Sequence, residues 1–168
     1  KQTNPCSAYS FAAQVAEVEV DTSTGSVKLL KLITCNDAGR ILSPLNAEGQ
    51  VEGCVLQGIG FTTCEEMKYN KEGQLMTTGF LSTGTPNAYD LPPIDVNFAD
   101  THDSYGPFGA KGLSELGAPP ATAAIANAVH DAVGVRITDL PITPEKIFRA
   151  LKRKQKGQQA PAKRRYSL

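Results

Sequence analysis

The sequence predicts an α+β fold of two small lobes, each with a short, mainly antiparallel sheet packed against helices. Three observations support this class. Apolar and polar residues alternate over 13–21 and 94–99, as in strands with one buried face. The stretches 43–66 and 121–133 carry helix-start signals together with apolar or small residues that suit packing. A chain of 168 residues is long enough for one domain, or two small lobes, with a real core.

The first expected element is a β-hairpin over residues 7–35. From residue 14 onward, acidic side chains collect on one face of its first strand and mostly apolar ones on the other. Asp21 can seed the turn and Gly25 can take a positive φ there. Residues 27–33 then return as the partner strand, so the pattern predicts an antiparallel pair with one buried face.

A helix interrupted by glycines is expected to begin at Ser43 and to run to about residue 66. Serine is a favourable N-cap, and Pro44 suits the first helical position because the N–H is unpaired there in any case. Four glycines follow in this helix, at a cost of about 1 kcal/mol each relative to alanine, so a packing or binding role must compensate. We expect close approach by a neighbouring backbone or a flat ligand at the three that share a face. These are Gly49, Gly53 and Gly60.

The later elements follow from the same signals. Pro119-Pro120 opens an alanine-rich helix that Gly134 ends, and Thr143 caps the last helix. The expected elements are a hairpin at 67–76, a strand at 94–99, a helix at 121–133, a short strand at 135–138 and a helix from 143 to about 154. We therefore expect a domain over residues 1–154, followed by a basic, flexible tail over 155–168.

Composition and charge narrow the functional classes. Hydrophobic residues make up 40% of the chain and charged residues 20%, with no apolar run long enough for a membrane span and no signal-peptide core, which favours a cytoplasmic protein. Seven basic residues and no acid follow residue 151, so the rest of the chain carries 17 − 7 = 10 basic against 17 acidic residues. Nucleic-acid binding through this tail is a weak hypothesis, because Tyr166 is its one aromatic residue and the body is acidic.

The four cysteines form no C-x-x-C pair that could hold zinc or an iron–sulfur cluster. Their scatter indicates small buried hydrophobic residues instead. They are Cys6, Cys35, Cys54 and Cys64.

One loop, over residues 106–120, is rich in glycine and proline and carries a single acid, Glu115. Ordering such a loop costs backbone entropy, which favours a rigid backbone that lies close to a ligand or another chain. Glycine also leaves main-chain N–H groups free to donate to an anion. The plainer interpretation is a surface turn with a solvated glutamate.

Two motifs carry a family resemblance. The loop contains Gly109-Ala110-Lys111-Gly112-Leu113-Ser114-Glu115, and the first helix contains Gly49-Gln50-Val51-Glu52-Gly53 followed by Gln57-Gly58-Ile59-Gly60. They resemble the Gly-x-Lys-Gly-x-Gly-Glu and Gly-Gln-Val-Glu-Gly-Ala-x-x-Gln-Gly-x-Gly motifs of the molybdenum hydroxylases, the xanthine dehydrogenase and aldehyde oxidase family. Ser114 stands where the family has glycine, and Cys54 where it usually has alanine. The resemblance covers roughly residues 7–151 and implies the fold of the C-terminal part of the molybdopterin-binding subunit.

The resemblance also implies a function. Family members are oxidoreductases that hydroxylate an N-heteroaromatic (purine-like) or aldehyde carbon with oxygen from water. Glu115 would be the general base, and Gln50 would hydrogen-bond the pterin, with Gln57 as a second contact. Lys111 and Gly112 would complete the cofactor-binding set, and no residue would ligate the metal directly. We expect Gln50 and Glu115 to meet at the crevice between the lobes.

The implied cofactor is molybdenum–molybdopterin, in a mononucleotide or dinucleotide form that this sequence leaves open. A [2Fe-2S] cluster and FAD would lie on partner chains or domains, since this chain has no segment for either. The implied partners are the remainder of the molybdenum subunit, an iron–sulfur subunit and, as a further option, an FAD subunit. The alternative is a non-catalytic interaction domain of the same fold, for which the departures at Ser114 and Cys54 leave room.

Overall fold

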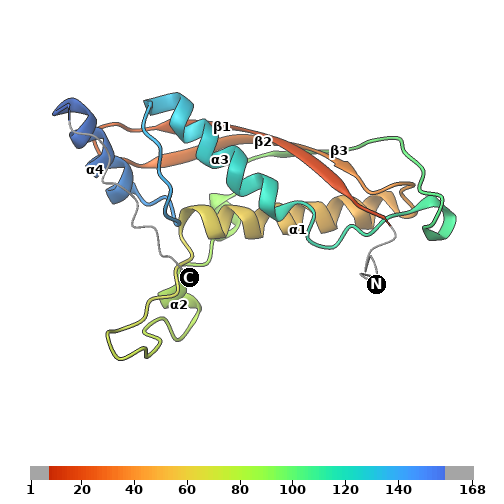
Figure 1. Cartoon of the computed structure of the whole chain (residues 1–168), viewed down its shortest axis with the longest axis horizontal. Coiled ribbons are helices and arrows are strands. Elements are labelled where there is room, and N and C mark those ends of the chain that lie inside the picture. Colours follow the sequence, from red (N-terminus) through yellow and green to blue (C-terminus); the bar gives the residue numbers. More distant parts are fainter. Residues whose placement is uncertain (1–7, 158–168) are drawn as a thin grey trace, which may run out of the picture.

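The computed structural model describes residues 8–157 (Figure 1). Its elements are β1 (Phe11–Val20), β2 (Val27–Asp37), α1 (Pro44–Thr63), α2 (Phe80–Thr83), η1 (Ala88–Asp90), β3 (Ile94–Phe98), η2 (Pro107–Gly109), α3 (Ala118–Val133) and α4 (Pro144–Gln155). The three strands form one sheet, and helices pack against one face of it, so the α+β class is confirmed.

The sheet has the order β1-β2-β3. β1 and β2 form the expected antiparallel hairpin, whose turn has Gly25 at φ 81°. β3 joins β2 in parallel, after a crossover that contains α1. The register shifts between Glu17 and Val18, which leaves Leu30 as an extra residue on β2 and turns its side chain partly to solvent.

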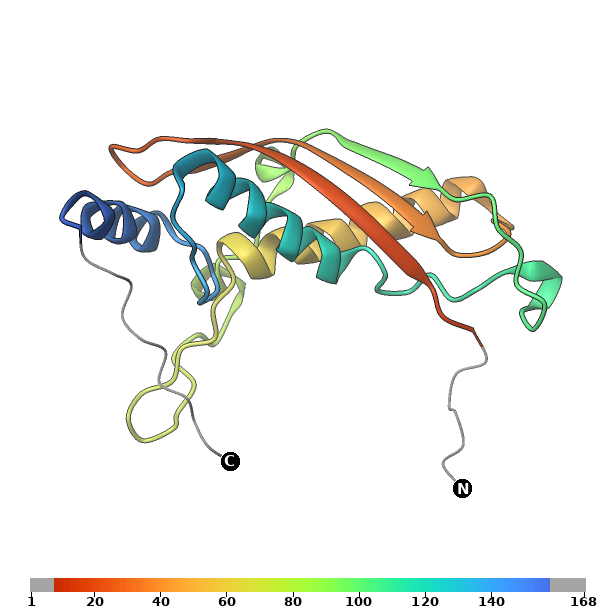
Figure 2. The same ribbon diagram turned by 45° about the horizontal axis from the view of Figure 1, so that its top comes forward.

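Two helices cover one face of the sheet. α3 packs against β1 and α1, and α1 also contacts β3 (Figure 2). The larger apolar cluster lies between these helices and the sheet, and is built on Leu32, Val51, Val55, Ile59, Ala121 and Ile125. The inward positions of the strands are therefore the even-numbered residues of β1 and, before and after the bulge, alternate residues of β2.

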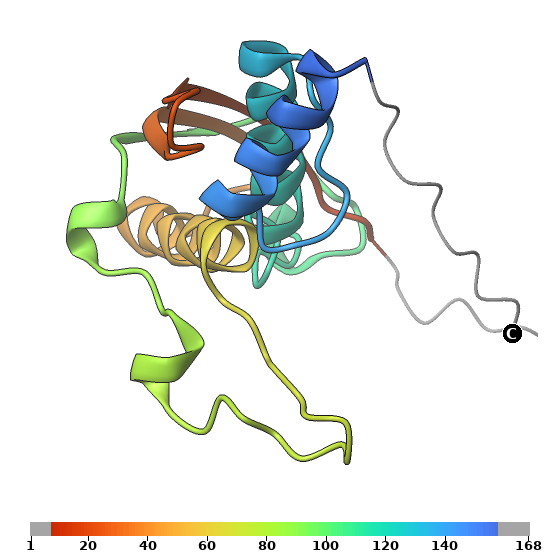
Figure 3. The ribbon, with the colours of Figure 1, turned by 90° about the vertical axis from the view of Figure 1, so that its left-hand side faces the viewer.

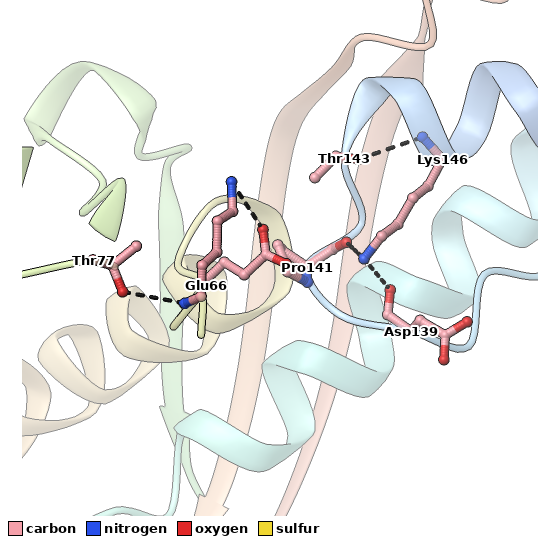
Figure 4. Close-up of polar contacts among 7 residues, drawn as sticks. Glu66, Thr77, Asp139, Pro141, Thr143 and Lys146 are labelled. Carbon is pink, nitrogen blue, oxygen red and sulfur yellow. Dashed lines mark hydrogen bonds and ion pairs between the residues drawn. The ribbon is translucent and has the colours of Figure 1, made fainter. Parts of the chain in front are cut away.

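A second apolar cluster lies near α4 and is built on Val129, Ile142 and Ile147. α4 sits beside the β1–β2 turn (Figure 3), where a Cβ on Gly25 would meet the carbonyl oxygen of Pro144. The ammonium of Lys146 donates to the carbonyl oxygens of Asp139 (3.0 Å) and Pro141 (2.8 Å), which ties the preceding loop to α4 (Figure 4). The two expected lobes are thus two clusters along one sheet rather than two separate sheets.

Two expected strands differ in the structure. The hairpin expected at 67–76 has its turn, but it pairs only through the isolated bridge between Tyr69 and Leu75. No strand forms at 135–138. A two-stranded ribbon needs a third strand or a packed face to be stable, and neither segment pairs with a strand of the sheet. Residues 67–83 instead project away from the body (Figures 1 and 3), whereas Leu91, further along the chain, packs against the larger apolar cluster.

No neighbouring backbone approaches the three glycines of α1 at which a backbone or a flat ligand was expected. Gly49 and Gly53 have open space where a Cβ would be, and a Cβ on Gly60 would meet the side chain of Glu65. The close backbone approach is at Gly58, where a Cβ would lie 2.5 Å from the carbonyl oxygen of Ala118. It is therefore Gly58 that lets α1 and α3 pack closely.

Candidate functional site

Glu115 lies in the turn of residues 114–117, directly before α3. Its side chain is exposed and makes no hydrogen bond or ion pair with any residue among 8–157. The carboxylate is therefore positioned by the main chain that carries it.

Side chains from two elements and the segment before β1 hold the carbonyl oxygens of this loop. Ser10 Oγ donates to the carbonyl of Gly112 (2.6 Å), and Gln14 Nε2 donates to that of Gly117 (2.8 Å). From α1, Gln50 Nε2 and Cys54 Sγ both donate to the carbonyl oxygen of Ser114, at 2.6 and 2.7 Å. The loop is thus anchored through its acceptors on both sides of Glu115.

The same loop also has main-chain donors. The N–H groups of residues 112–117 donate to no residue in the described part of the chain. Pro119 and Pro120 have no N–H, so the start of α3 adds few donors of its own. Gly112, Ser114, Glu115 and Leu116 line a depression beside the loop, so their N–H groups are the ones that a ligand bound there could meet.

Lys111 anchors the start of the loop. Its ammonium lies 2.7 Å from a carboxylate oxygen of Asp37 at the end of β2, and it also lies over the ring of Phe11. Thr101 donates to the other carboxylate oxygen of Asp37 at 2.5 Å. The hydrogen bonds from Lys111 and then Thr101 lower the pKa of Asp37 to about 2. This pair is largely buried and fixes the loop to the sheet.

An open depression of about 800 Å³ lies beside the loop. Three of the predicted site residues line it, namely Lys111, Gly112 and Glu115. Tyr9 and Tyr105 contribute aromatic walls. The depression is wide enough for part of a flat ligand and is lined by the loop's main chain.

The predicted residues on α1 lie differently. Gln50 reaches the same loop through Ser114, next to Glu115, so the two motifs meet as expected. Gln57 lies two turns further, roughly 10 Å along the helix, and its exposed side chain bonds to no described residue. The anchoring residues Ser10, Gln14 and Asp37 were not singled out from the sequence. The one feature of the sequence that could have indicated these three residues is that each is polar and lies at or near the end of an expected strand.

The cysteine prediction is right only in part. Cys54 is buried, whereas Cys35 is exposed and Cys64 is half-buried. Cys6 lies outside the described residues. Within residues 8–157, no group of three or more histidine, cysteine or acidic side chains could hold a metal ion, and no helix is long and apolar enough to cross a membrane.

A comparison with protein families identifies the chain. The family model described as the molybdopterin cofactor-binding domain matches residues 1–92. The chain belongs to this family. The match includes the Gln50 motif on α1.

Relatives of this molybdopterin cofactor-binding domain extend the match past Glu115. The chain is 41% identical to the gamma subunit of the 6-hydroxypseudooxynicotine dehydrogenase complex of Paenarthrobacter nicotinovorans, over 83% of this chain and 18% of the relative. It is 39% identical to a probable hypoxanthine oxidase of Escherichia coli strain K12, over 89% of this chain and 16% of the relative. The chain thus spans less than a fifth of the length of these relatives.

Solved structures agree with this family. The fold superimposes on quinoline 2-oxidoreductase from Pseudomonas putida 86 with a TM-score of 0.76 and 37% sequence identity, over 80% of this chain and 18% of that one. The relatives are therefore molybdenum oxidoreductases of the xanthine dehydrogenase and aldehyde oxidase kind.

The residues present fit a pterin. A pterin edge carries both donors and acceptors, which the row of free N–H groups at 112–117 and the amide of Gln50 can meet. The Oε1 atom of Gln50 accepts no hydrogen bond from the described residues, because the bonds to Ser114 and Cys54 use Nε2. Gly49 and Gly53 leave open space on the same helix, where no described residue lies within 4 Å of the position of a Cβ.

Proposed function

We propose that this chain forms the C-terminal portion of a molybdenum-cofactor oxidoreductase that hydroxylates an N-heteroaromatic, purine-like carbon or an aldehyde carbon. The oxygen comes from water, and the substrate loses two electrons and one proton as the hydroxyl group is added. The observation that carries the proposal is the anchored turn that presents Glu115 beside a row of free main-chain donors. The relatives' names, which include a hypoxanthine oxidase and a nicotine 6-hydroxylase, support the substrate class.

In this proposal Glu115 is the general base. Its carboxylate is exposed at the depression and has no partner among the described residues, so it is available to take a proton from the attacking water. When bound, the molybdenum–molybdopterin cofactor would supply the redox centre that accepts the two electrons. Removal of the proton by this carboxylate makes the oxygen more nucleophilic as it approaches the carbon.

The other site residues hold the cofactor. Gln50 would accept from the pterin through Oε1 while its Nε2 keeps Ser114 in place. The N–H of Gly112 would donate to a polar edge of the ligand, and Gln57 would contact a more distant part. Lys111 would act mainly through the loop, because its charge is already paired with Asp37.

The partners are part of the same proposal. Relatives are named as subunits, one the gamma subunit of a complex and another a large subunit. We propose that this chain works with the remainder of a molybdenum subunit, an iron–sulfur partner and, in some assemblies, an FAD partner. These would carry away the electrons, since no described residue here forms a redox centre.

The test is a Glu115→Gln change in the complex recovered through a tag on this chain. We expect molybdenum content and native mass to stay the same while turnover of heteroaromatic and aldehyde substrates falls by about 10²- to 10⁴-fold, the usual contribution of a general base. Glu72→Gln, an exposed acid in the projecting segment, is the matched control and should keep full activity.

Two outcomes would count against the proposal. Retained turnover in Glu115→Gln would remove the general-base role. A recovered chain without molybdenum would favour the alternative, a non-catalytic interaction domain of the same fold.

A further inference from the structure

The turn that carries Glu115 is held by side chains whose donors all point at main-chain carbonyl oxygens. The anchor at Ser114 comes from α1 and the anchor at Gly117 comes from β1, so Glu115 lies between two fixed points three residues apart. Because the Glu115 side chain has no described partner, these anchors fix only the main chain from which its carboxylate extends.

We propose that Gln14 and Cys54 are positioning residues for the general base. Neither touches the depression, and each acts through the carbonyl oxygen that it holds. The role of Glu115 in this proposal rests on the proposed function. The anchoring of the loop by Gln14 and Cys54 does not depend on that function.

Gln14 is oriented by the loop and by nothing else in the described structure. Its Nε2 donates to the carbonyl oxygen of Gly117 at 2.8 Å, while its Oε1 is buried without a partner among the described residues. Rotating the amide by 180° would set two acceptors against each other, so the donor must face Gly117. A buried carbonyl oxygen without a hydrogen-bond partner lowers the stability of a fold, so the Oε1 atom of Gln14 does not stabilise this protein. Its evident contribution is the hold on the turn.

Cys54 completes the second anchor. Its thiol is 3% exposed, and it shares the carbonyl oxygen of Ser114 with Nε2 of Gln50. A carbonyl oxygen has two lone pairs, so these two donors use its full capacity. If Gln50 also serves the pterin, Cys54 is the donor that stays with Ser114 whatever Gln50 does. Gly117 packs against the same cysteine, which joins the two anchors.

The test compares variants that remove a donor with one that keeps it. Gln14→Met keeps the side-chain length and removes both the donor and the unpaired oxygen. Cys54→Ala removes the thiol, whereas Cys54→Ser keeps a donor in place. Cys35→Ala is the control, because that thiol is exposed and makes no hydrogen bond to a described residue. Each is made in the recovered complex, and kcat, KM, molybdenum content, thermal midpoint and a crystal structure are determined.

We expect Gln14→Met and Cys54→Ala to shift residues 114–117 or raise their B-factors and to lower kcat by about tenfold or more, with KM and molybdenum content unchanged. The thermal midpoint of Gln14→Met should change little, since the unpaired oxygen of Gln14 is removed while the carbonyl oxygen of Gly117 loses its donor. Cys54→Ser and Cys35→Ala should keep the parent's kcat.

Parent kcat in Gln14→Met and Cys54→Ala would overturn the positioning role, whether or not the loop moved. A fall in kcat with the loop unmoved would also overturn it. If Glu115→Gln proved active, the proposed function would fail by itself, and the crystal structures would still decide whether Gln14 and Cys54 anchor the turn.

Discussion

Asp37 is the charged residue that ties the candidate site to the sheet. Lys111, Thr101 and the N–H of Gly39 all donate to its carboxylate. The separation of 74 positions between Asp37 and Lys111 explains why the sequence did not predict this pair, since the pair exists only once β2 and the loop are side by side. By contrast, the meeting of Gln50 with the Glu115 turn was predicted, because two recognisable motifs carried it.

Asp37→Asn should lower the free energy of unfolding of the chain by about 2 kcal/mol at pH 7, the scale of a hydrogen bond to a charged group. The pKa of Asp37 lies at about 2, below its ordinary value of 3.8. Its contribution is therefore present above about pH 4 and is lost as the pH falls towards 2. Urea unfolding at pH 7 and pH 2.5 measures this.

The control for this experiment lies in the β1–β2 turn. Asp21 also has a pKa lowered to about 2, by hydrogen bonds from Ser23 and Thr24. Its contribution to stability is therefore lost in the same pH window in the parent and in Asp37→Asn. Only the difference between parent and Asp37→Asn reports on Asp37. An equal loss of stability on acidification in the two proteins would show that the ion pair with Lys111 contributes nothing.

At the scale of elements, α1 shows what a sequence pattern leaves open. The helix and its start at Ser43 were predictable from local signals, and Pro44 is indeed its first residue. Which glycine is required was not predictable, because that depends on where α3 crosses the helix. The same reason applies to Leu30, which is inward or outward only according to the register of β1 against β2. Local patterns thus predicted the hairpin of β1 and β2, β3 and the three long helices, whereas contacts between elements decided the details and left the segments 67–76 and 135–138 without strands.

Gly58→Ala should destabilise the chain by about 1 to 3 kcal/mol, the cost of forcing an extra methyl group into a packed contact. Its Cβ would lie 2.5 Å from the carbonyl oxygen of Ala118 and 2.7 Å from Cβ of Ala121. Gly53→Ala is the matched change on the same helix and meets nothing within 4 Å, so it should gain up to about 1 kcal/mol of helix stability. Urea unfolding of the two variants distinguishes them.

Equal effects of the two alanine substitutions would contradict the packing of α1 on α3. The recovered complex offers a second comparison for Gly53→Ala. A loss of molybdenum from that complex, with a more stable chain, would indicate that the open space at Gly53 is used by the cofactor or by another part of the enzyme.

At the scale of the whole molecule, the described residues cover the sheet on one face only. Both apolar clusters lie on the side of α1, α3 and α4. The other face has a charged end, with Lys31 and Asp95 paired at 2.6 Å, and an apolar end. The apolar end consists of Phe11, Ala13, Val15, Ile33 and Cys35. A globular chain that spans less than a fifth of its relatives' length is expected to leave such a surface open when it is alone.

The chain expressed alone should therefore self-associate through this apolar end. Val15 and Ile33 lie directly opposite each other on β1 and β2 and are 66% and 39% exposed, so they form the centre of the surface. Changing both to threonine keeps the β-branched shape that suits a strand, while a hydroxyl group replaces one methyl of Val15 and the ethyl branch of Ile33. Sedimentation velocity over a range of concentrations should show a smaller weight-average mass for this double variant than for the parent. Glu19→Thr, on the charged end of the same face, should leave the mass unchanged. A parent chain that stays monomeric at every concentration would contradict this prediction, because it would show that this face is stable in water without a partner. The charged end and the twist of the edge strand would then be enough to keep copies apart.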